Sequence, residues 1–205
     1  MINPEFLVNG VLRGVLGGRP KKSKKALRYL TGRGGGGGWM SNPNTLLTAA
    51  GVVWGIFETM NQPVSQTPQT PPSPALPPLP DALPGVPTDA LRIVRLAISA
   101  ANADGVMHEA ERAAVVAQAA ASGASDLIAA ELVQRRPLAE IVAGVADPAQ
   151  RAVLYVLAFT VLRADEQISG SERIYLAQLA NLLGLSPQDV QRLEQGASER
   201  IDNEG

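Results

Sequence analysis

The chain has 205 residues, with 18 basic and 19 acidic side chains and a formal net charge of −1, so its overall charge predicts no particular partner. That length suits one ordinary domain with additional segments, or two small domains. There is no cysteine and only one histidine, which excludes disulfides, thiolate metal sites and any mechanism that needs two imidazoles.

The charges are distributed unevenly along the chain. Residues 1–62 carry eight basic and two acidic side chains, a net of +6, whereas residues 88–205 carry ten basic and sixteen acidic ones, a net of −6. All four lysines lie within residues 21–25. A basic N-terminal region and an acidic C-terminal region indicate a positively charged contact surface at one end of the chain only.

Residues 1–62 are predicted to form a basic, apolar, glycine-rich region that associates with a membrane. An apolar stripe at residues 6–16 is interrupted by Gly10 and Gly14. Each interior glycine costs a helix about 1 kcal/mol relative to alanine, so a helix here is marginal unless another part of the protein holds it.

A second apolar stretch occupies the twelve residues 46–57. A membrane-spanning helix needs about 20 apolar residues, so an interfacial or re-entrant segment fits at least as well as a single pass. Trp39 and Trp54 suit the membrane interface. We therefore expect attachment to a bacterial inner membrane, peripheral or single-pass, with the helical domain on the cytoplasmic side. Contacts to anionic headgroups are expected from the four lysines, which are Lys21, Lys22, Lys24 and Lys25.

The basic run also supports an alternative. Residues 21–33 could be a disordered arm of a soluble scaffold or nucleic-acid-binding protein, in which basic side chains neutralise phosphates and Tyr29 stacks on a base. The apolar stretch that follows favours the membrane over nucleic acid.

A proline-rich linker is predicted at residues 63–87, which hold ten of the sixteen prolines and one charge, Asp81. Such a chain lacks the donors for a regular hydrogen-bond ladder and favours extended, polyproline-like conformations. A docking motif for proline-binding domains at residues 71–74 is the alternative, although no basic side chain flanks these prolines.

Residues 88–196 are predicted to form an all-α domain, a compact bundle of about seven helices, followed by a polar tail at residues 197–205. Apolar side chains recur with the i, i+3, i+4 spacing of helices, and no segment alternates with period two. Residues 152–162 are apolar all round but too few to span a bilayer, so they predict the central helix. A bundle of this size buries a core without disulfides or metal.

Several helix starts can be predicted from capping residues. Ser125, Asp147, Ser169 and Ser186 each offer a side-chain oxygen that can cap the first turn of a helix. After Asp147 and Ser186 a proline follows at the first helical position, which strengthens the prediction there.

Two corners of this domain match each other at an offset of sixty-one residues. In both, Ala-Asp ends one helix, and Glu-Arg follows seven and eight residues after the Asp. If the two halves pack face to face, the four carboxylates share one pocket and require a cation such as Ca²⁺, or neighbouring arginines. These candidate metal ligands are Asp104, Glu111, Asp165 and Glu172.

Local stabilisation explains the same residues one by one. Ser169 and Glu172 have the spacing of a capping box, in which the two residues bond each other's backbone N–H groups. Arg112 and Arg173 could neutralise the carboxylates as ion pairs. Structural capping and pairing is therefore the favoured alternative to a metal site.

The two Ala-Asp-x₆-Glu-Arg corners in an all-helical domain resemble the TerB-like family, known from tellurite-resistance proteins. The region ahead of them resembles the bacterial inner-membrane members of that family. The resemblance implies a seven-helix bundle with an acidic face that binds a divalent cation, and a role in metal, tellurite or envelope stress. We therefore expect a non-enzymatic, membrane-associated module that binds a partner protein. A hydrolase with a metal among the four carboxylates is the enzymatic alternative.

Overall fold

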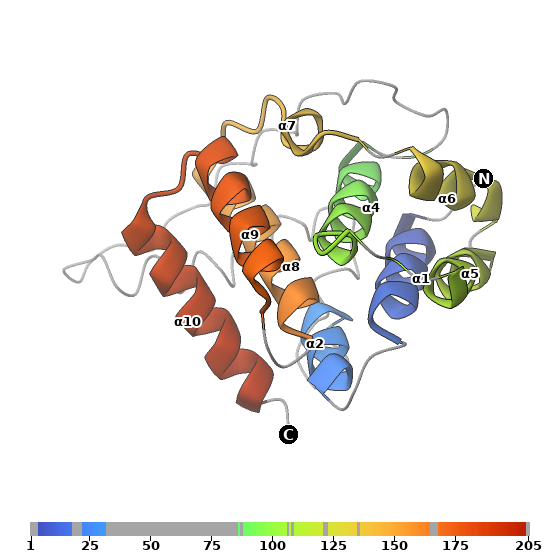
Figure 1. Ribbon diagram of the computed structural model, residues 1–205, viewed down its shortest axis with the longest axis horizontal. Helices are drawn as coiled ribbons and strands as arrows, with labels where there is room; N and C mark the ends of the chain where they lie inside the picture. The colour runs from blue at the N-terminus through green and yellow to red at the C-terminus, as the bar shows by residue number, and fades with distance from the viewer. Residues whose placement is uncertain are drawn as a thin grey trace, which may run out of the picture.

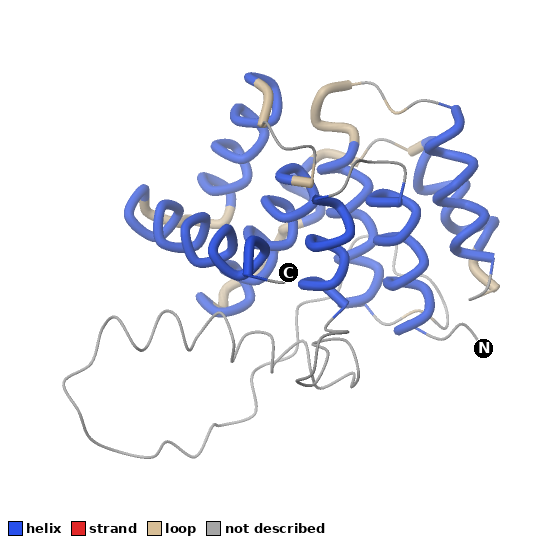
Figure 2. Tube along the Cα trace, turned by 90° about the horizontal axis from the view of Figure 1, so that it is seen from below, coloured by secondary structure: helices blue, strands red, loops and turns tan. Residues whose placement is uncertain are grey.

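The structure is a computed structural model, and the part of the chain that it describes is all-helical, as predicted. Figure 2 shows the described residues as helices with short loops and turns, and no strand among them. The described residues are 4–17, 22–31, 86, 88–105, 107, 109–120, 123–134, 136–164 and 168–203.

Seven of the described helices follow residue 87, which confirms the predicted helix number for this part of the chain. Two more, α1 (Pro4–Gly17) and α2 (Lys22–Thr31), precede them. The seven are α4 (Thr88–Ala101), α5 (Glu109–Ala119), α6 (Ser125–Val133), α7 (Leu138–Ile141), α8 (Pro148–Arg163), α9 (Gly170–Leu182) and α10 (Pro187–Asn203).

Helix α8 lies at the centre of the bundle. All residues from 152 to 162 are buried, which confirms the prediction from their apolar sequence. The helix contacts α4, α9, α10 and α2. Figure 1 shows α10 at one edge of the bundle and α5 at the other, with α1 and α4 between α5 and α8.

Helices α1 and α2 belong to the same core as the seven helices that follow. Leu7 and Leu12 of α1 and Leu30 of α2 are fully buried in it. Helix α1 contacts α4 and α5, and α2 contacts α8 and α10. The sequence prediction did not include these two helices in the bundle, so its division at residues 63–87 separates segments that share one core.

Two glycines allow α1 to lie directly against α5. A Cβ atom at Gly10 would lie 2.6 Å from the carbonyl oxygen of Gln118, and one at Gly14 would collide with the Cα atom of Val115. The glycines that weaken α1 as an isolated helix therefore permit its close packing. Burial against α5 and α4 offsets the helix-propensity cost.

The structure confirms the predicted N-cap at three of the four helix starts. Asp147 accepts a hydrogen bond from the Ala149 N–H at 3.0 Å, and Ser186 and Ser169 accept from the third residue of their helices. The prediction for Ser125 was wrong. The cap position of α6 is Ala124, which makes no side-chain cap bond and is buried, so packing rather than a hydroxyl sets this start.

The described helices contain none long and apolar enough to cross a membrane. The apolar stretch at residues 46–57, Lys21 and all of the predicted linker at residues 63–87 except Val86 lie outside the described residues.

All three tyrosines of the chain lie in the core or against it. The Tyr155 hydroxyl donates to Glu194 at 2.6 Å, and the Tyr175 hydroxyl donates to Ser99 at 3.2 Å. Burial raises the pKa of Tyr29, Tyr155 and Tyr175 above the ordinary value of 10.0, and the bond to Glu194 raises that of Tyr155 further. These hydroxyls therefore stay protonated in the folded protein at pH values that ionise them in the unfolded chain.

Replacing Gly14 by alanine is expected to lower the free energy of unfolding by about 1–3 kcal/mol, because the added methyl group forces α1 away from α5. The matched control is Gly17→Ala at the end of the same helix, where a Cβ has no neighbour within 4 Å. The control should be neutral or stabilising by up to about 1 kcal/mol. Urea unfolding followed by circular dichroism measures both, and equal effects would contradict the close packing.

The free energy of unfolding is expected to fall as the pH rises above 10. The unfolded chain releases its tyrosine protons near pH 10.0 and the folded protein at higher pH, so the unfolded state then binds fewer protons. Each tyrosine adds a slope of up to about 1.4 kcal/mol per pH unit, and Tyr155→Phe should remove one such contribution. Urea unfolding at a series of pH values measures the slope. An unchanged slope in Tyr155→Phe would contradict the raised pKa.

Candidate functional site

The four acidic residues of the two matching corners have different surroundings. Asp104 is exposed in the turn after α4, and Glu111 is half-buried in the first turn of α5. Glu172 is buried in the first turn of α9. Asp165 lies outside the described residues.

Glu172 takes part in a capping box. Its carboxylate accepts a hydrogen bond from the Ser169 N–H at 2.7 Å, while the Ser169 hydroxyl oxygen accepts one from the Glu172 N–H at 3.3 Å. This confirms the capping prediction for the second corner. Glu172 therefore stabilises the start of α9 whether or not it has any further role.

No group of three or more histidine, cysteine, aspartate or glutamate side chains that could hold a metal ion occurs among the described residues. Asp104, Glu111 and Glu172 thus do not form a metal site by themselves. Because Asp165 is the fourth member of the predicted set and lies outside the description, the four-carboxylate cation site stays a prediction.

The basic helix α2 is hydrogen-bonded to the end of α10. The Lys25 ammonium donates to the backbone carbonyl of Asp202 at 3.0 Å, which satisfies a carbonyl in the last turn of α10 and complements its dipole. The Asp202 carboxylate also pairs with Arg163 of α8 at 3.1 Å. Ala26 and Leu30 of the same helix are buried in the core. The end of α10 therefore joins α2 to α8.

Tyr29 points its ring toward the protein. It packs against the core, and its burial raises the pKa of its hydroxyl. A base-stacking platform needs an exposed ring. This position counts against the nucleic-acid alternative, in which Tyr29 would stack on a base.

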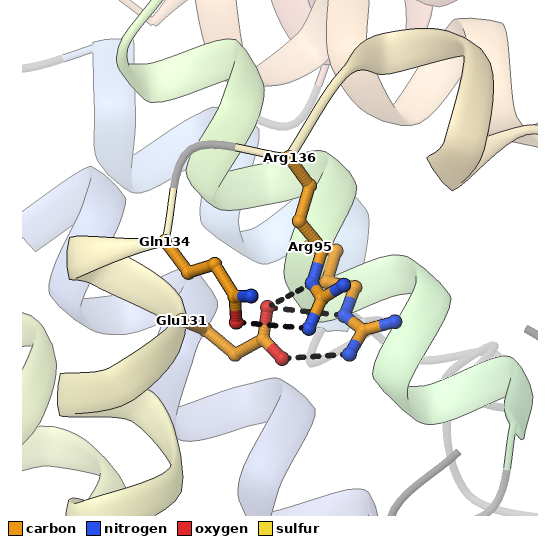
Figure 3. Close-up of polar contacts among 4 residues, drawn as sticks. All are labelled: Arg95, Glu131, Gln134 and Arg136. Atoms are coloured by element: carbon orange, nitrogen blue, oxygen red, sulfur yellow. Dashed lines mark hydrogen bonds and ion pairs between the residues drawn. The ribbon is translucent and has the colours of Figure 1, made fainter. Parts of the chain in front are cut away.

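A buried ion cluster joins α4 to α6 and to the loop before α7 (Figure 3). Arg95 binds Glu131 through two bonds, Nε to Oε2 at 3.0 Å and Nη2 to Oε1 at 2.7 Å. Arg136 donates from Nε to the same Oε2 at 3.1 Å and from Nη2 to Gln134 at 3.0 Å. The side chains of Arg95, Glu131 and Arg136 are only 3, 6 and 10% exposed. The buried Glu131 carboxylate thus binds two guanidinium groups.

A second buried arginine follows the same helix. Arg92 is fully buried, and its Nη1 donates to the backbone carbonyls of Ile141 and Ala143, at and just beyond the end of α7. Burial lowers the pKa of Arg92, and Asp89 opposes this effect. Helix α4 therefore holds the four-residue helix α7 through Arg92 and holds α6 through Arg95.

Sequence reasoning missed this cluster. Arg92 and Arg95 lie among the apolar residues of α4, and Glu131 lies between the apolar positions 128 and 132 of α6. Charged side chains are rarely fully buried unless they are paired. Opposite charges inside two apolar stripes are the signal that could have predicted the pair.

A small cavity opens beside the cluster, between α4, the α6–α7 region and α9. Its volume is about 230 Å³. The polar side chains around it are Arg95, Ser99, Asn102, Glu131, Gln134, Arg136 and Tyr175. This cavity is a candidate ligand site that none of the sequence motifs predicted.

The architecture is that of a helical bundle in which a long segment separates α2 from α4. The chain belongs to the family described as "Protein of unknown function (DUF533)", which matches residues 5–197. The match begins in α1 and ends in α10, so it includes the two helices that precede the segment. No curated protein and no solved structure matches the chain significantly.

The family match corrects the sequence prediction. The matching family is not a TerB family, so the resemblance drawn from the two acidic corners was wrong. The physical reason is the low specificity of the pattern. An acidic residue in the first turn after a helical corner is favoured at any helix start, and Glu172 shows this local use.

Replacing Glu131 by glutamine is expected to lower the free energy of unfolding by about 3–5 kcal/mol, because it leaves two buried guanidinium groups without their carboxylate. The matched control is Glu140→Gln, an exposed glutamate on neighbouring α7, which should change stability by no more than about 0.5 kcal/mol. Urea unfolding of both variants decides the outcome. Similar small effects at both positions would show that the cluster adds nothing to stability.

Proposed function

We propose that the protein is a non-enzymatic module that associates with an anionic membrane surface through the segment between α2 and α4. The observation that supports it best is the position of α2. This helix starts within the lysine run, packs into the bundle, and ends three residues before an uncharged stretch that extends from residue 34 to residue 57.

Both ends of the segment belong to the bundle. Leu30, one residue before the end of α2, is fully buried, and Val86, two residues before α4, is 8% exposed. Residues 32–85 are therefore an insertion within one helical unit rather than a terminal tail. A membrane contact made by this insertion holds the whole bundle close to the lipid surface.

The charges of α2 suit such a contact. Each lysine near an anionic surface contributes about 1 kcal/mol. The uncharged stretch begins only three residues after the end of α2 in the sequence. Trp39 and Trp54 of the insertion have the amphipathic rings that favour the interface. The basic helix and the insertion together provide the electrostatic and apolar parts of membrane binding.

The buried polar side chains support a role without catalysis. The five that the structure describes are all engaged within the protein: with a backbone carbonyl, in the ion cluster, or in the α9 cap. These bonds stabilise the fold, so the role proposed for the bundle is binding rather than catalysis. The five are Arg92, Arg95, Glu131, Thr160 and Glu172.

The full chain is expected to float with vesicles of phosphatidylcholine and phosphatidylglycerol, and to bind pure phosphatidylcholine vesicles much more weakly. Higher salt should weaken the binding, because the lysine contribution is screened. The double variant Lys22→Gln/Lys24→Gln leaves Lys25 on Asp202 and should weaken binding about thirtyfold.

The matched control is Arg13→Gln/Arg173→Gln, which removes two positive charges from exposed positions on α1 and α9. Its binding should remain close to that of the unchanged protein. Absence of flotation with anionic vesicles would refute the proposal. An equal loss in both double variants would show that net charge, and not α2, determines the binding.

A further inference from the structure

We propose that the protein forms a symmetric dimer in which the groove between α5 and α6 of one copy packs against the same groove of a second copy. The residues that carry this inference belong neither to α2 nor to the insertion, so it does not depend on membrane association.

The groove between α5 and α6 is open and largely apolar. Its volume is about 550 Å³. Figure 1 shows α5 at an edge of the bundle with α6 next to it, and these two helices together form one end of the molecule in that view. Four exposed alanines line the groove, which are Ala113, Ala117, Ala120 and Ala129.

The side chains of the groove suit a close contact with another protein surface. Val133, which also lines the groove, is 77% exposed, the highest value among the large apolar side chains that the structure describes. Alanine loses no rotamer entropy on burial, and its small side chain lets a second helix approach closely. A partner that covers this surface therefore gains apolar burial at little entropic cost.

Opposite charges at the groove indicate that its occupant is a second copy of the chain. Glu109 and Arg112 line the groove from the first turn of α5, and neither makes an ion pair within the described chain. A uniformly acidic or basic partner matches only one of these charges. A surface that carries both, one helical turn apart, is complementary to itself about a twofold axis.

Such an axis places Glu109 of each copy opposite Arg112 of the other copy. The dimer then has two equivalent ion pairs beside the apolar contact that Val133 and the alanines make. Charge pairs at the rim of an interface contribute mainly to its register and specificity, and the apolar centre contributes most of the affinity.

Sedimentation equilibrium of the full chain without lipid should show a dimer whose fraction rises with protein concentration between about 1 and 100 μM. Val133→Glu should weaken the association at least about tenfold, because it brings a charge into the apolar contact. The matched control is Ile174→Glu, at an exposed apolar residue of α9 outside the groove, which should associate as the unchanged protein does.

A monomer at every concentration refutes the proposal. This includes a monomer whose groove is covered by residues 46–57 of the same chain or by another protein. A dimer that Val133→Glu leaves intact also refutes it, because the interface is then elsewhere on the molecule.

Charge reversals test the twofold arrangement. Glu109→Arg and Arg112→Glu should each weaken the association at least about tenfold, because like charges then face each other across the axis. The double variant Glu109→Arg/Arg112→Glu restores both ion pairs and should dimerise again. An equimolar mixture of the two single variants should form mixed dimers for the same reason, and this rescue requires that both variants are folded.

A double variant and a mixture that associate as weakly as the single variants would contradict the paired charges. The variant Lys22→Gln/Lys24→Gln should dimerise as the unchanged protein does. Because all these measurements are made without lipid, failure of this inference and failure of the membrane proposal can be told apart.

Discussion

The close packing of α1 on α5 is the constraint on which the arrangement of the whole chain depends. Gly10 and Gly14 let the backbone of α1 lie against Val115 and Gln118, and the apolar side chains of α1 then reach the common core. The two helices before residue 32, α1 and α2, are therefore part of the bundle. Residues 32–85 are consequently an insertion between two parts of the bundle, and this is the basis of the proposed membrane attachment.

Helix α4 organises the other side of the bundle through buried arginines. Arg92 binds carbonyl groups at and just beyond the end of α7, and Arg95 binds Glu131 of α6. A helix as short as α7 has little stability of its own, so these bonds hold it where packing alone would not. The bonds to Glu131 also place Arg136 beside Arg95 in the lining of the cavity.

The sequence predicted what depends on neighbouring residues and missed what depends on distant ones. The seven helices after residue 87, the central helix and the caps at Asp147 and Ser169 all follow from periodicity or from residues within one turn. The place of α1 could not be predicted in this way, because the partner that makes its glycines favourable lies about a hundred residues later in the chain. The Arg95–Glu131 pair, 36 residues apart, was missed for the same reason.

The two matching acidic corners show that helix capping can produce the same residue spacing as a shared metal site. Glu111 is the third residue of α5 and Glu172 is the third residue of α9, the position from which a carboxylate reaches back to the start of its helix. A negative charge there is also favoured by the helix dipole. Two helices that begin at equivalent points of two similar corners therefore acquire the same spacing without any cation between them. The repeated spacing alone therefore does not indicate a metal ion. A cation site would require that the four carboxylates lie close to one another.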